Sequence, residues 1–206
     1  MSCLSIPAMD LIREQTVLQR LPKISLEGGE CLMISGQNGA GKSTLIGCVA
    51  GLSADTSIQT HLPLRLIGHK LALVNELSVI ENLKLMHALD LKKPAIDAVL
   101  VELLSKVGLI QRRNQPCTRL SAGQKRRLQL SRLWMSPPSP CLWLLDEPLT
   151  ALDAAFHQTL ITQIDRLLSL GHAMVITSHQ PIRLQTQTVI SLSFSGLGEL
   201  AQLGQA

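Results

Sequence analysis

The residues from Gly36 to Ser43 have the types and spacing of a phosphate-binding loop, because they run Gly-Gln-Asn-Gly-Ala-Gly-Lys-Ser. They follow the apolar run 31–34 and precede a helix predicted over 42–50. Glycines in such a loop let backbone N–H groups face an anion, and the lysine would reach the β- and γ-phosphates. A chance match in a glycine turn is the alternative, which the preceding apolar run disfavours. The pattern predicts a nucleoside triphosphate site made by Gly36, Gln37, Asn38, Gly39, Ala40, Gly41, Lys42, Ser43 and Thr44.

Two acidic residues end a second apolar run, in which 142–145 is followed by Asp146 and Glu147. Asp146, at the carboxyl end of a strand, would hold Mg²⁺ together with the Ser43 hydroxyl. Glu147 lies one residue further, where it can accept the proton of an attacking water, and such a base accelerates a reaction by ~10² to 10⁴. An acidic turn of purely structural importance is the alternative, and the phosphate loop favours the catalytic interpretation.

The segment 120–124, Leu-Ser-Ala-Gly-Gln, predicts the start of a helix. Ser121 and Gln124 have the spacing of a capping box, which alone would explain both residues. In a functional interpretation, the helix end offers the Ser121 hydroxyl, the Gly123 N–H and a partial positive charge to a phosphate. Gly123 would leave room for that phosphate to approach. We call residues 121–124 the signature segment.

Composition limits the classes of function. The 206 residues suffice for one good core, and 46% hydrophobic with 17% charged residues is a globular composition. The net charge of +4 is weak evidence about partners. With four aromatic residues and no nucleic-acid-binding motif, we expect no nucleic-acid partner. The five cysteines form no C-x-x-C pair, and the six histidines lack metal-ligand spacing. Buried free thiols in a reducing compartment are therefore predicted.

The order of predicted elements indicates an α/β fold. Short antiparallel strands are predicted over 9–26, and apolar strands near 30–35, 64–67, 141–145, 173–177 and 189–192. Helices alternate with them, and the pattern is helical from 78 to 109. Apolar strands that alternate with helices favour a mainly parallel sheet covered on both faces. One domain, 1–206, is predicted, with a core lobe over about 1–75 and 135–206 and an inserted helical lobe over about 76–134. No run approaches the ~18 apolar residues that cross a bilayer, so another chain would supply any membrane path.

Five motifs occur in a fixed order: the phosphate loop, the signature segment, Leu-Leu-Asp-Glu-Pro at 144–148, Ala-Leu-Asp at 151–153 and Thr-Ser-His at 177–179. Over nearly its whole length, the chain resembles the nucleotide-binding subunit of ATP-binding-cassette (ABC) transporters. Gly-His at 68–69 and Glu-Leu-Ser-Val-Ile-Glu-Asn-Leu at 76–83 are further similar to the ATPases of cytochrome c maturation, also called haem exporters. The resemblance implies a P-loop NTPase fold with a small antiparallel N-terminal β-subdomain and an inserted helical lobe.

The resemblance also implies a mechanism. Two copies would form a head-to-tail homodimer that traps ATP between the phosphate loop of one copy and Ser121, Ala122, Gly123 and Gln124 of the other. ATP would be hydrolysed to ADP and phosphate with Mg²⁺ as cofactor. Glu147 would be the base, and His179 would stabilise the transition state together with Lys42. Asp153 would couple the two sites or only cap the helix 154–170, and both can hold.

The implied partners are integral membrane subunits of a cytochrome c maturation complex. The chain would lie peripherally on the cytoplasmic face of the inner membrane and meet the membrane through these partners only. Leu77, Leu83, Leu85 and Met86 would line the docking groove or pack the lobe's own core. Lys125, Arg126 and Arg127 are predicted to form a solvated helix face, and contact with lipid headgroups is the alternative. An ATPase of another small ABC transporter and a binding-only regulatory cassette are the alternatives.

Two positions depart from the family pattern. Lys70 stands where most relatives carry a glutamine that touches Mg²⁺ and the attacking water, and lysine can donate but cannot ligate a cation. Lys70 would instead pair with Glu147 or with a phosphate oxygen. Relatives often stack adenine on an aromatic side chain of the first hairpin, but no aromatic residue precedes Trp134. The base would then lie against Val17, Leu18 or the Arg13 guanidinium, which predicts weak discrimination between bases.

Overall fold

The computed structural model describes residues 2–52, 57–135, 137, 139–179, 182–185, 189–194 and 197–205. The chain divides into two compact units. The first unit comprises Met1–Gly68, Pro140–Pro148 and Ile164–Ala206, and the second comprises His69–Ser139 and Leu149–Gln163. The second unit thus includes 149–163 as well as the helical stretch predicted from the sequence.

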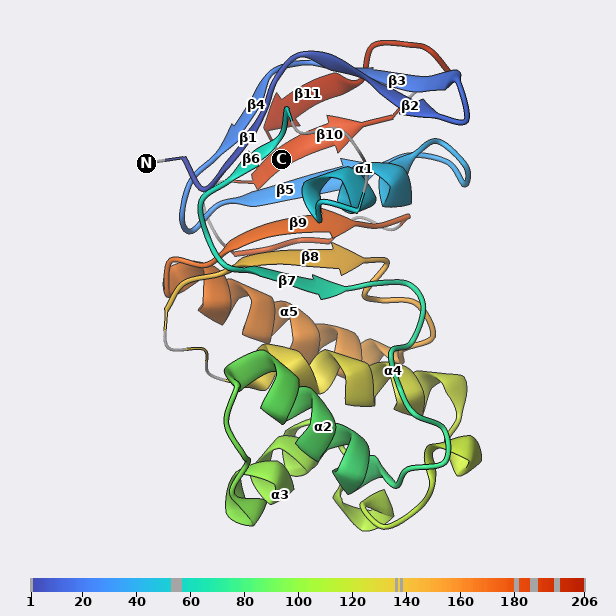
Figure 1. Ribbon diagram of the computed structural model, residues 1–206, viewed down its shortest axis with the longest axis vertical. Coiled ribbons are helices and arrows are strands. Elements are labelled where there is room, and N and C mark those ends of the chain that lie inside the picture. The colour runs from blue at the N-terminus through green and yellow to red at the C-terminus, as the bar shows by residue number, and fades with distance from the viewer. Residues whose placement is uncertain are drawn as a thin grey trace. The chain divides into compact units, whose positions relative to one another are not determined.

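A six-stranded sheet forms the centre of the first unit, with the strand order β11-β10-β5-β9-β8-β7 (Figure 1). Neighbouring strands run parallel except β11, which is antiparallel to β10. Every residue of β8 and β9 is buried, which is the pattern of strands covered on both faces. The strands are β5 (Cys31–Ser35), β7 (Leu64–Ile67), β8 (Leu142–Asp146), β9 (Ala173–Thr177), β10 (Val189–Ser193) and β11 (Gln202–Gln205).

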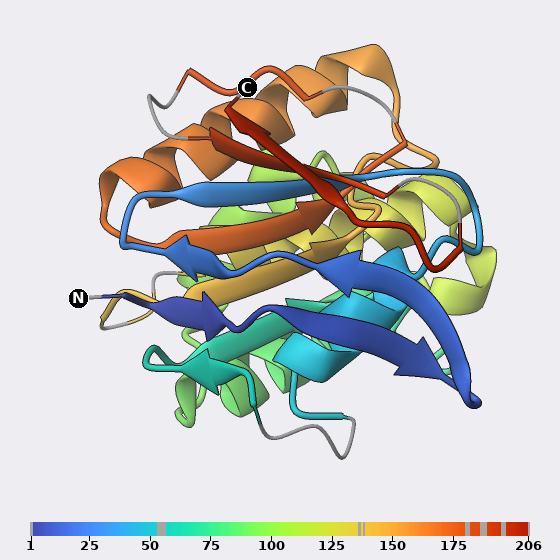
Figure 2. The same ribbon diagram turned by 90° about the horizontal axis from the view of Figure 1, so that it is seen from above.

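Small antiparallel pairings accompany this sheet, and all but one of their strands lie in the N-terminal part of the chain, as predicted. Strands β1 (Leu4–Ile6), β4 (Ile24–Leu26) and β6 (Gln59–Thr60) form a sheet in the order β4-β1-β6. A hairpin joins β2 (Met9–Arg13) to β3 (Thr16–Leu21), and its tight turn is visible in Figure 2. The hairpin is tied to the end of the chain, because Gly198 N donates to Leu18 O at 3.0 Å and Ala201 N donates to Arg20 O at 2.9 Å.

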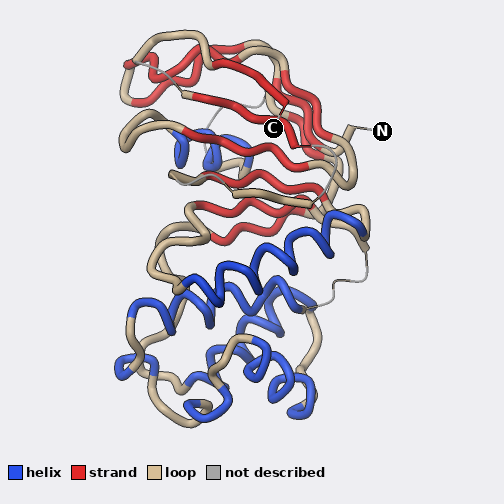
Figure 3. The backbone as a smooth tube through the Cα atoms, turned by 180° about the vertical axis from the view of Figure 1, so that it is seen from behind, coloured by secondary structure: helices blue, strands red, loops and turns tan. Residues whose placement is uncertain are grey.

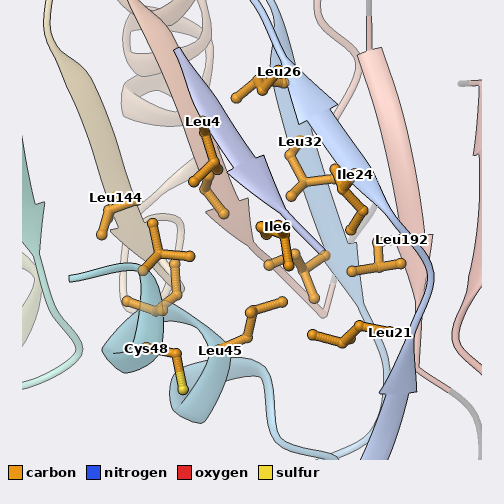
Figure 4. Packing of buried hydrophobic residues seen from close by; sticks show 14 of the residues in the cluster. Leu4, Ile6, Leu21, Ile24, Leu26, Leu32, Leu45, Cys48, Leu144 and Leu192 are labelled. Atoms are coloured by element: carbon orange, nitrogen blue, oxygen red, sulfur yellow. The ribbon is translucent and has the colours of Figure 1, made fainter. Parts of the chain in front are cut away.

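The core of the first unit holds helix α1 (Lys42–Val49), which starts at the phosphate loop. Apolar side chains of the antiparallel strands, of the large sheet and of α1 meet in one cluster (Figure 4). Burial of each such side chain is worth about 1.5–3 kcal/mol. Side chains from the antiparallel strands and from the large sheet therefore hold α1 in place. The labelled members of the cluster are Leu4, Ile6, Leu21, Ile24, Leu26, Leu32, Leu45, Cys48, Leu144 and Leu192.

The second unit is helical, and Figure 3 shows its helices in blue. A capping box opens α2, as predicted, because Glu81 N donates to Ser78 Oγ and Ser78 N donates to Glu81 Oε2. Its elements are α2 (Val79–Leu91), α3 (Asp97–Lys106), the 3₁₀ turns η1 (Ile110–Arg112), η2 (Cys117–Arg119) and η3 (Ser131–Trp134), α4 (Ala122–Leu130) and the first part of α5 (Ala154–Ser169).

The residues predicted to line a docking groove or to pack the lobe's own core differ in how far they are buried. Leu83 and Met86 are buried, so for them the core interpretation is correct. Leu77 is half-buried, and Leu85 is 41% exposed. Only part of the predicted set is therefore accessible to a partner. All five cysteines are buried and free, as predicted, and burial raises the pKa of the Cys31 thiol.

Candidate nucleotide site

The phosphate loop follows β5 and continues directly into α1. Gly36 has a φ of 144°, and a Cβ there would lie 2.8 Å from Phe194 Cβ. Gly41 has a φ of 106°, and a Cβ there would crowd Leu11 and Leu18 at 3.2 and 3.1 Å. Only glycine satisfies both demands. Gly41 is also the N-cap of α1 and supplies no side-chain hydrogen bond, so the first N–H groups of the helix remain available to an anion.

The remaining loop residues lie where a ligand can reach most of them. Gln37, Asn38, Gly39 and Ser43 are exposed, Thr44 is half-buried, and Ala40 is buried. The exposed Ser43 hydroxyl belongs to the first turn of α1, directly after Lys42. Exposed backbone and a hydroxyl beside an uncapped helix end form a site suited to phosphate oxygens.

Lys42 lies at the centre of the predicted catalytic group. Its side chain is 7% exposed, and Nζ donates to Gly36 O at 2.8 Å and to Gln37 O at 3.0 Å. Nζ is also 3.8 Å from Glu147 Oε1. Burial lowers the pKa of Lys42, while the nearby Glu147 carboxylate acts in the opposite direction. The lysine is thus held inside the loop by two carbonyl oxygens that a phosphate can replace.

The three predicted catalytic residues lie together in the first unit. His179 Nε2 is 3.0 Å from Glu147 Oε1, and His179 Nδ1 is 3.5 Å from Lys42 Nζ. Glu147 has a φ of 50°, in the left-handed region. A non-glycine residue there costs about 1–3 kcal/mol and persists only where its surroundings enforce it. The backbone therefore turns the Glu147 carboxylate toward the lysine and the histidine at an energetic cost.

Thr177 holds this arrangement, although it was not among the predicted site residues. Its hydroxyl donates to Asp146 Oδ1 at 2.6 Å and accepts from Glu147 N at 2.9 Å. Asp146 and Thr177 are neighbours in the parallel β8–β9 ladder, so the strand register places them side by side. One feature of the sequence could have indicated this role: Thr177 is a hydroxyl residue at the end of the otherwise apolar strand 173–177. We infer that Thr177 orients both acidic residues.

The residues proposed to bind a metal ion have suitable chemistry. Mg²⁺ prefers oxygen ligands, and Ser43 and Asp146 offer a hydroxyl and a carboxylate. Asp146 is buried at the end of β8, where its carboxylate is oriented by Thr177. Among the described residues no group of three His, Cys, Asp or Glu side chains could hold a metal by itself. This donor set fits an ion that also takes ligands from a nucleotide and water.

The signature segment lies at the start of α4 in the second unit. Gln124 N donates to Ser121 Oγ at 3.2 Å, and Ser121 N donates to Gln124 Oε1 at 3.0 Å, which confirms the capping box. Ser121 and Ala122 are exposed. A hollow of about 480 Å³ lies beside them. It is lined by Gly108, Ser121, Gly123, Gln124, Arg127, Ala151, Leu152 and Asp153.

Gly123 has a structural reason that requires no nucleotide. A Cβ on this residue would lie 2.5 Å from Ala151 O, closer than real Cβ contacts come. Ala151 itself has a φ of 64°, in the left-handed region. The turn 149–153 therefore approaches α4, which we call the signature helix, so closely that only glycine fits at this position. Room for a phosphate remains a prediction beside this observed role.

Asp153 caps α5, because Phe156 N donates to Asp153 Oδ1 at 2.8 Å. Its other carboxylate oxygen pairs with Arg127, whose guanidinium lies 4.8 Å from the centre of the Phe156 ring. The Phe156 hydrogen bond, with help from Arg127, lowers the pKa of Asp153. The helix-cap interpretation is therefore correct, and coupling between two sites stays a prediction.

The predicted solvated face at 125–127 is wrong for Arg126, and Arg127 is only partly exposed. Arg126 is 4% exposed and donates to Gln129 Oε1 at 2.6 Å. The Arg127 side chain is 23% exposed and contacts Asp153 and Phe156. Consecutive residues of a helix point about 100° apart, so three adjacent cations cannot share one face.

Residues 21–150 match the family described as ABC transporter. The chain belongs to this family. It is an ABC-type ATPase, which confirms the predicted resemblance and the predicted α/β fold class. Within the described residues, no helix combines the length and the apolar character that crossing a membrane requires.

Two curated relatives are similar over most of their length. The cytochrome c biogenesis ATP-binding export protein CcmA of Vibrio cholerae is 34% identical over 191 residues, which cover 86% of this chain and 91% of the relative. The protein of the same name from Idiomarina loihiensis is 36% identical over 203 residues, covering 92% and 91%. Among solved structures, an inward-facing metal-chelate-type ABC transporter matches with a TM-score of 0.78 at 24% identity. The match covers 100% of this chain and 84% of that one, and supports the fold alone.

The close approach of Gly123 to Ala151 predicts that Gly123→Ala destabilises the second unit by about 1–3 kcal/mol, because the added Cβ overpacks the turn 149–153. Thermal unfolding of the nucleotide-free chain would measure this. Gly47→Ala, in α1, is the matched control, because a Cβ added there meets no atom within 4 Å, and it should be neutral or stabilising. Equal melting temperatures for the two variants would contradict the packing role.

Proposed function

We propose that this chain is the ATP-hydrolysing subunit of an ABC transporter complex in cytochrome c biogenesis, which exports haem or releases a haem carrier. The ATPase part rests on the clustering of Lys42, Glu147 and His179 at one edge of the sheet. The cytochrome c part rests on the two relatives that carry this function in their names. A binding-only cassette would have no use for a carboxylate strained toward the lysine and the histidine, and this disfavours that alternative.

ATP would bind with its phosphates against the N-terminus of α1. The uncapped N–H groups and the positive end of the helix favour the negative charge there. Lys42 Nζ would exchange its bonds to Gly36 O and Gln37 O for bonds to phosphate oxygens. Because this side chain is already buried in position, little conformational entropy is lost when the nucleotide arrives.

Mg²⁺, held by the Ser43 hydroxyl and the Asp146 carboxylate, would neutralise charge on the phosphates. Glu147 would accept a proton from the attacking water. At the same time the water oxygen would bond to the γ-phosphorus, and the bond between the γ-phosphorus and the oxygen that stays with ADP would break. His179 would keep the Glu147 carboxylate in place, since the two lie 3.0 Å apart, and would stabilise the transition state with Lys42. Thr177 would hold Glu147 and Asp146 in register through its hydroxyl.

Two copies of the chain would complete each site. The hollow beside Ser121, Gly123 and Gln124 lies at the N-terminus of α4, whose partial positive charge suits a phosphate. A head-to-tail pair would bring this surface of one copy to the phosphate loop of the other, with two equal sites in a C₂ dimer. Asp153, in the same hollow, would then lie at the interface and couple the two sites.

The proposal predicts that Glu147→Gln traps an ATP-bound dimer. Without a proton acceptor, phosphate release should fall at least ~100-fold while ATP still closes the dimer. Light scattering of the purified complex, with and without MgATP, would detect the pairing. Lys42→Met is the control that should lose both pairing and hydrolysis. Glu147→Gln copies that remain apart under ATP with the membrane subunits present would refute the shared-site mechanism.

The membrane partners would dock on the second unit from the cytoplasmic face of the inner membrane, so that the chain is peripheral. Leu85 and Leu89 lie one turn apart on α2, where they are 41% and 70% exposed, and Ile96 is 72% exposed. A hollow of about 410 Å³ between α2 and α3 includes Ile96. Exposed apolar side chains one turn apart on a helix suit a helix of an integral membrane subunit.

Docking through α2 predicts that Leu85→Asp combined with Leu89→Asp reduces the recovery of membrane subunits with the tagged chain at least about tenfold. The charges would remain unsatisfied against an apolar helix. Mass spectrometry of the complex purified from membranes would measure recovery and identify the partners. Leu170→Asp, at a leucine of the first unit that is 57% exposed, is the control. Partners unrelated to cytochrome c maturation would favour another small ABC transporter.

The missing aromatic platform predicts that GTP is turned over within a few-fold of ATP. Leu18 is buried against Gly41, which leaves half-buried Val17 and Arg13, whose side chain is 67% exposed, to meet the base. Val17 carries no hydrogen-bonding side-chain group, and a guanidinium plane stacked on the base contacts the ring faces of adenine and guanine alike. Phosphate release by the purified complex with each nucleotide would measure the ratio. A GTP rate far below the ATP rate would show that the base is discriminated.

A further inference from the structure

Two polar side chains are buried on the side of α4 that faces away from solvent. Arg126 is 4% exposed and Gln129 is 1% exposed. Arg126 Nη1 donates to Gln129 Oε1 at 2.6 Å, and Gln129 Nε2 donates to Lys70 O at 3.1 Å. Burial of polar groups is unfavourable unless they are hydrogen-bonded, and Gln129 uses both ends of its amide to satisfy groups on two different elements.

The loop that Gln129 holds connects the two units. It leaves β7 after Ile67, whose partner in the parallel ladder is Leu145, the residue directly before Asp146. The chain passes into the second unit at His69. The loop therefore begins beside the strand that carries both acidic residues and ends at the capping box of α2.

The two halves of this loop are held by different residues. Asn82, which is 1% exposed, holds the second half, because it accepts from Val74 N at 2.8 Å and donates to Val74 O at 2.9 Å and to Leu77 O at 3.2 Å. In the first half of the loop, Gln129 holds the backbone through its hydrogen bond to Lys70 O. The position of Lys70 thus depends on a side chain of the signature helix.

We propose that Gln129 is a positioning residue for ATP hydrolysis, which links movement of the signature helix to the loop at Lys70. This rests on the proposed function. Ser121 caps the N-terminal end of α4, where it would meet the nucleotide of the other copy. Gln129 lies near the C-terminal end of the same helix, where it donates a hydrogen bond to Lys70 O. Closure of the dimer at Ser121 would therefore draw the loop, and through it the end of β7, into the arrangement required for hydrolysis.

Gln129→Glu separates this role from simple packing. The carboxylate still accepts from Arg126, and more strongly, but it cannot donate to Lys70 O. Gln129→Met fills a similar volume and loses both hydrogen bonds. Gln163→Met is the matched control, because Gln163 is a second buried glutamine of the second unit, and its Nε2 donates to the backbone oxygen of Leu133 at 2.7 Å.

Trypsin provides a readout that is independent of ATP. Lys70 is exposed, and cleavage after it requires the local backbone to open. Loss of one hydrogen bond should raise cleavage of the Lys70–Leu71 bond in the nucleotide-free chain roughly three- to tenfold. We expect this increase in both Gln129 variants and not in Gln163→Met, with thermal unfolding of Gln129→Glu close to that of the parent chain.

Turnover by the purified complex gives the second readout. In Gln129→Glu, kcat should fall roughly three- to tenfold while KM for ATP stays within about twofold, because the phosphate loop is untouched. Parental cleavage and parental kcat in Gln129→Glu would overturn the proposal, as would faster cleavage with unchanged kcat. If the parent complex itself hydrolyses no ATP, the proposed function fails, whereas the cleavage experiment still decides whether Gln129 holds the loop.

Discussion

Several backbone N–H groups of the phosphate loop must keep facing one small volume before any ligand is present, and the first unit is organised around that constraint. A glycine-rich loop loses more conformational entropy on ordering than other loops do, so it must be held by its surroundings. Lys42 bonds to the carbonyls of Gly36 and Gln37 from inside the loop. Leu11 and Leu18 pack against Gly41 from the hairpin, and Phe194 packs against Gly36. None of these contacts uses a backbone N–H group of the loop.

Charge is concentrated at the same edge of the sheet. A buried lysine is costly without an anion, and Glu147 supplies one at 3.8 Å. Because β8 and β9 are parallel neighbours, their ends present the acidic pair and His179 side by side. Thr177 spans the two strands and holds Asp146 and Glu147 at once. The strained backbone of Glu147 is thereby compensated by the hydrogen bond that its N–H donates.

In the second unit, α4 is the element on which the other parts depend. It presents the signature segment, and it anchors both the turn 149–153 and the loop at Lys70.

Features set by neighbours in the chain could be predicted from the sequence. The glycine loop after an apolar strand, the capping boxes at Ser78 and Ser121 and the alternation of strands and helices all depend on contacts within a few residues. The same reasoning failed for 125–127, because helical direction and packing, and not charge, decide which arginine is buried. It also left open whether Leu83 and Met86 line a groove or pack the core, and burial decided for the core.

The tertiary structure alone decided which distant residues meet. Thr177 reaches Asp146 across 31 positions, and Gln129 reaches Lys70 across 59. Gly123 is explained by a carbonyl of the turn at Ala151, which no local pattern indicates. Local motifs carry their own hydrogen-bond partners within a turn or two of chain, so the sequence by itself determined them. Contacts between separate elements depend on strand register and on the packing of a whole core, whose free energy is shared among many side chains.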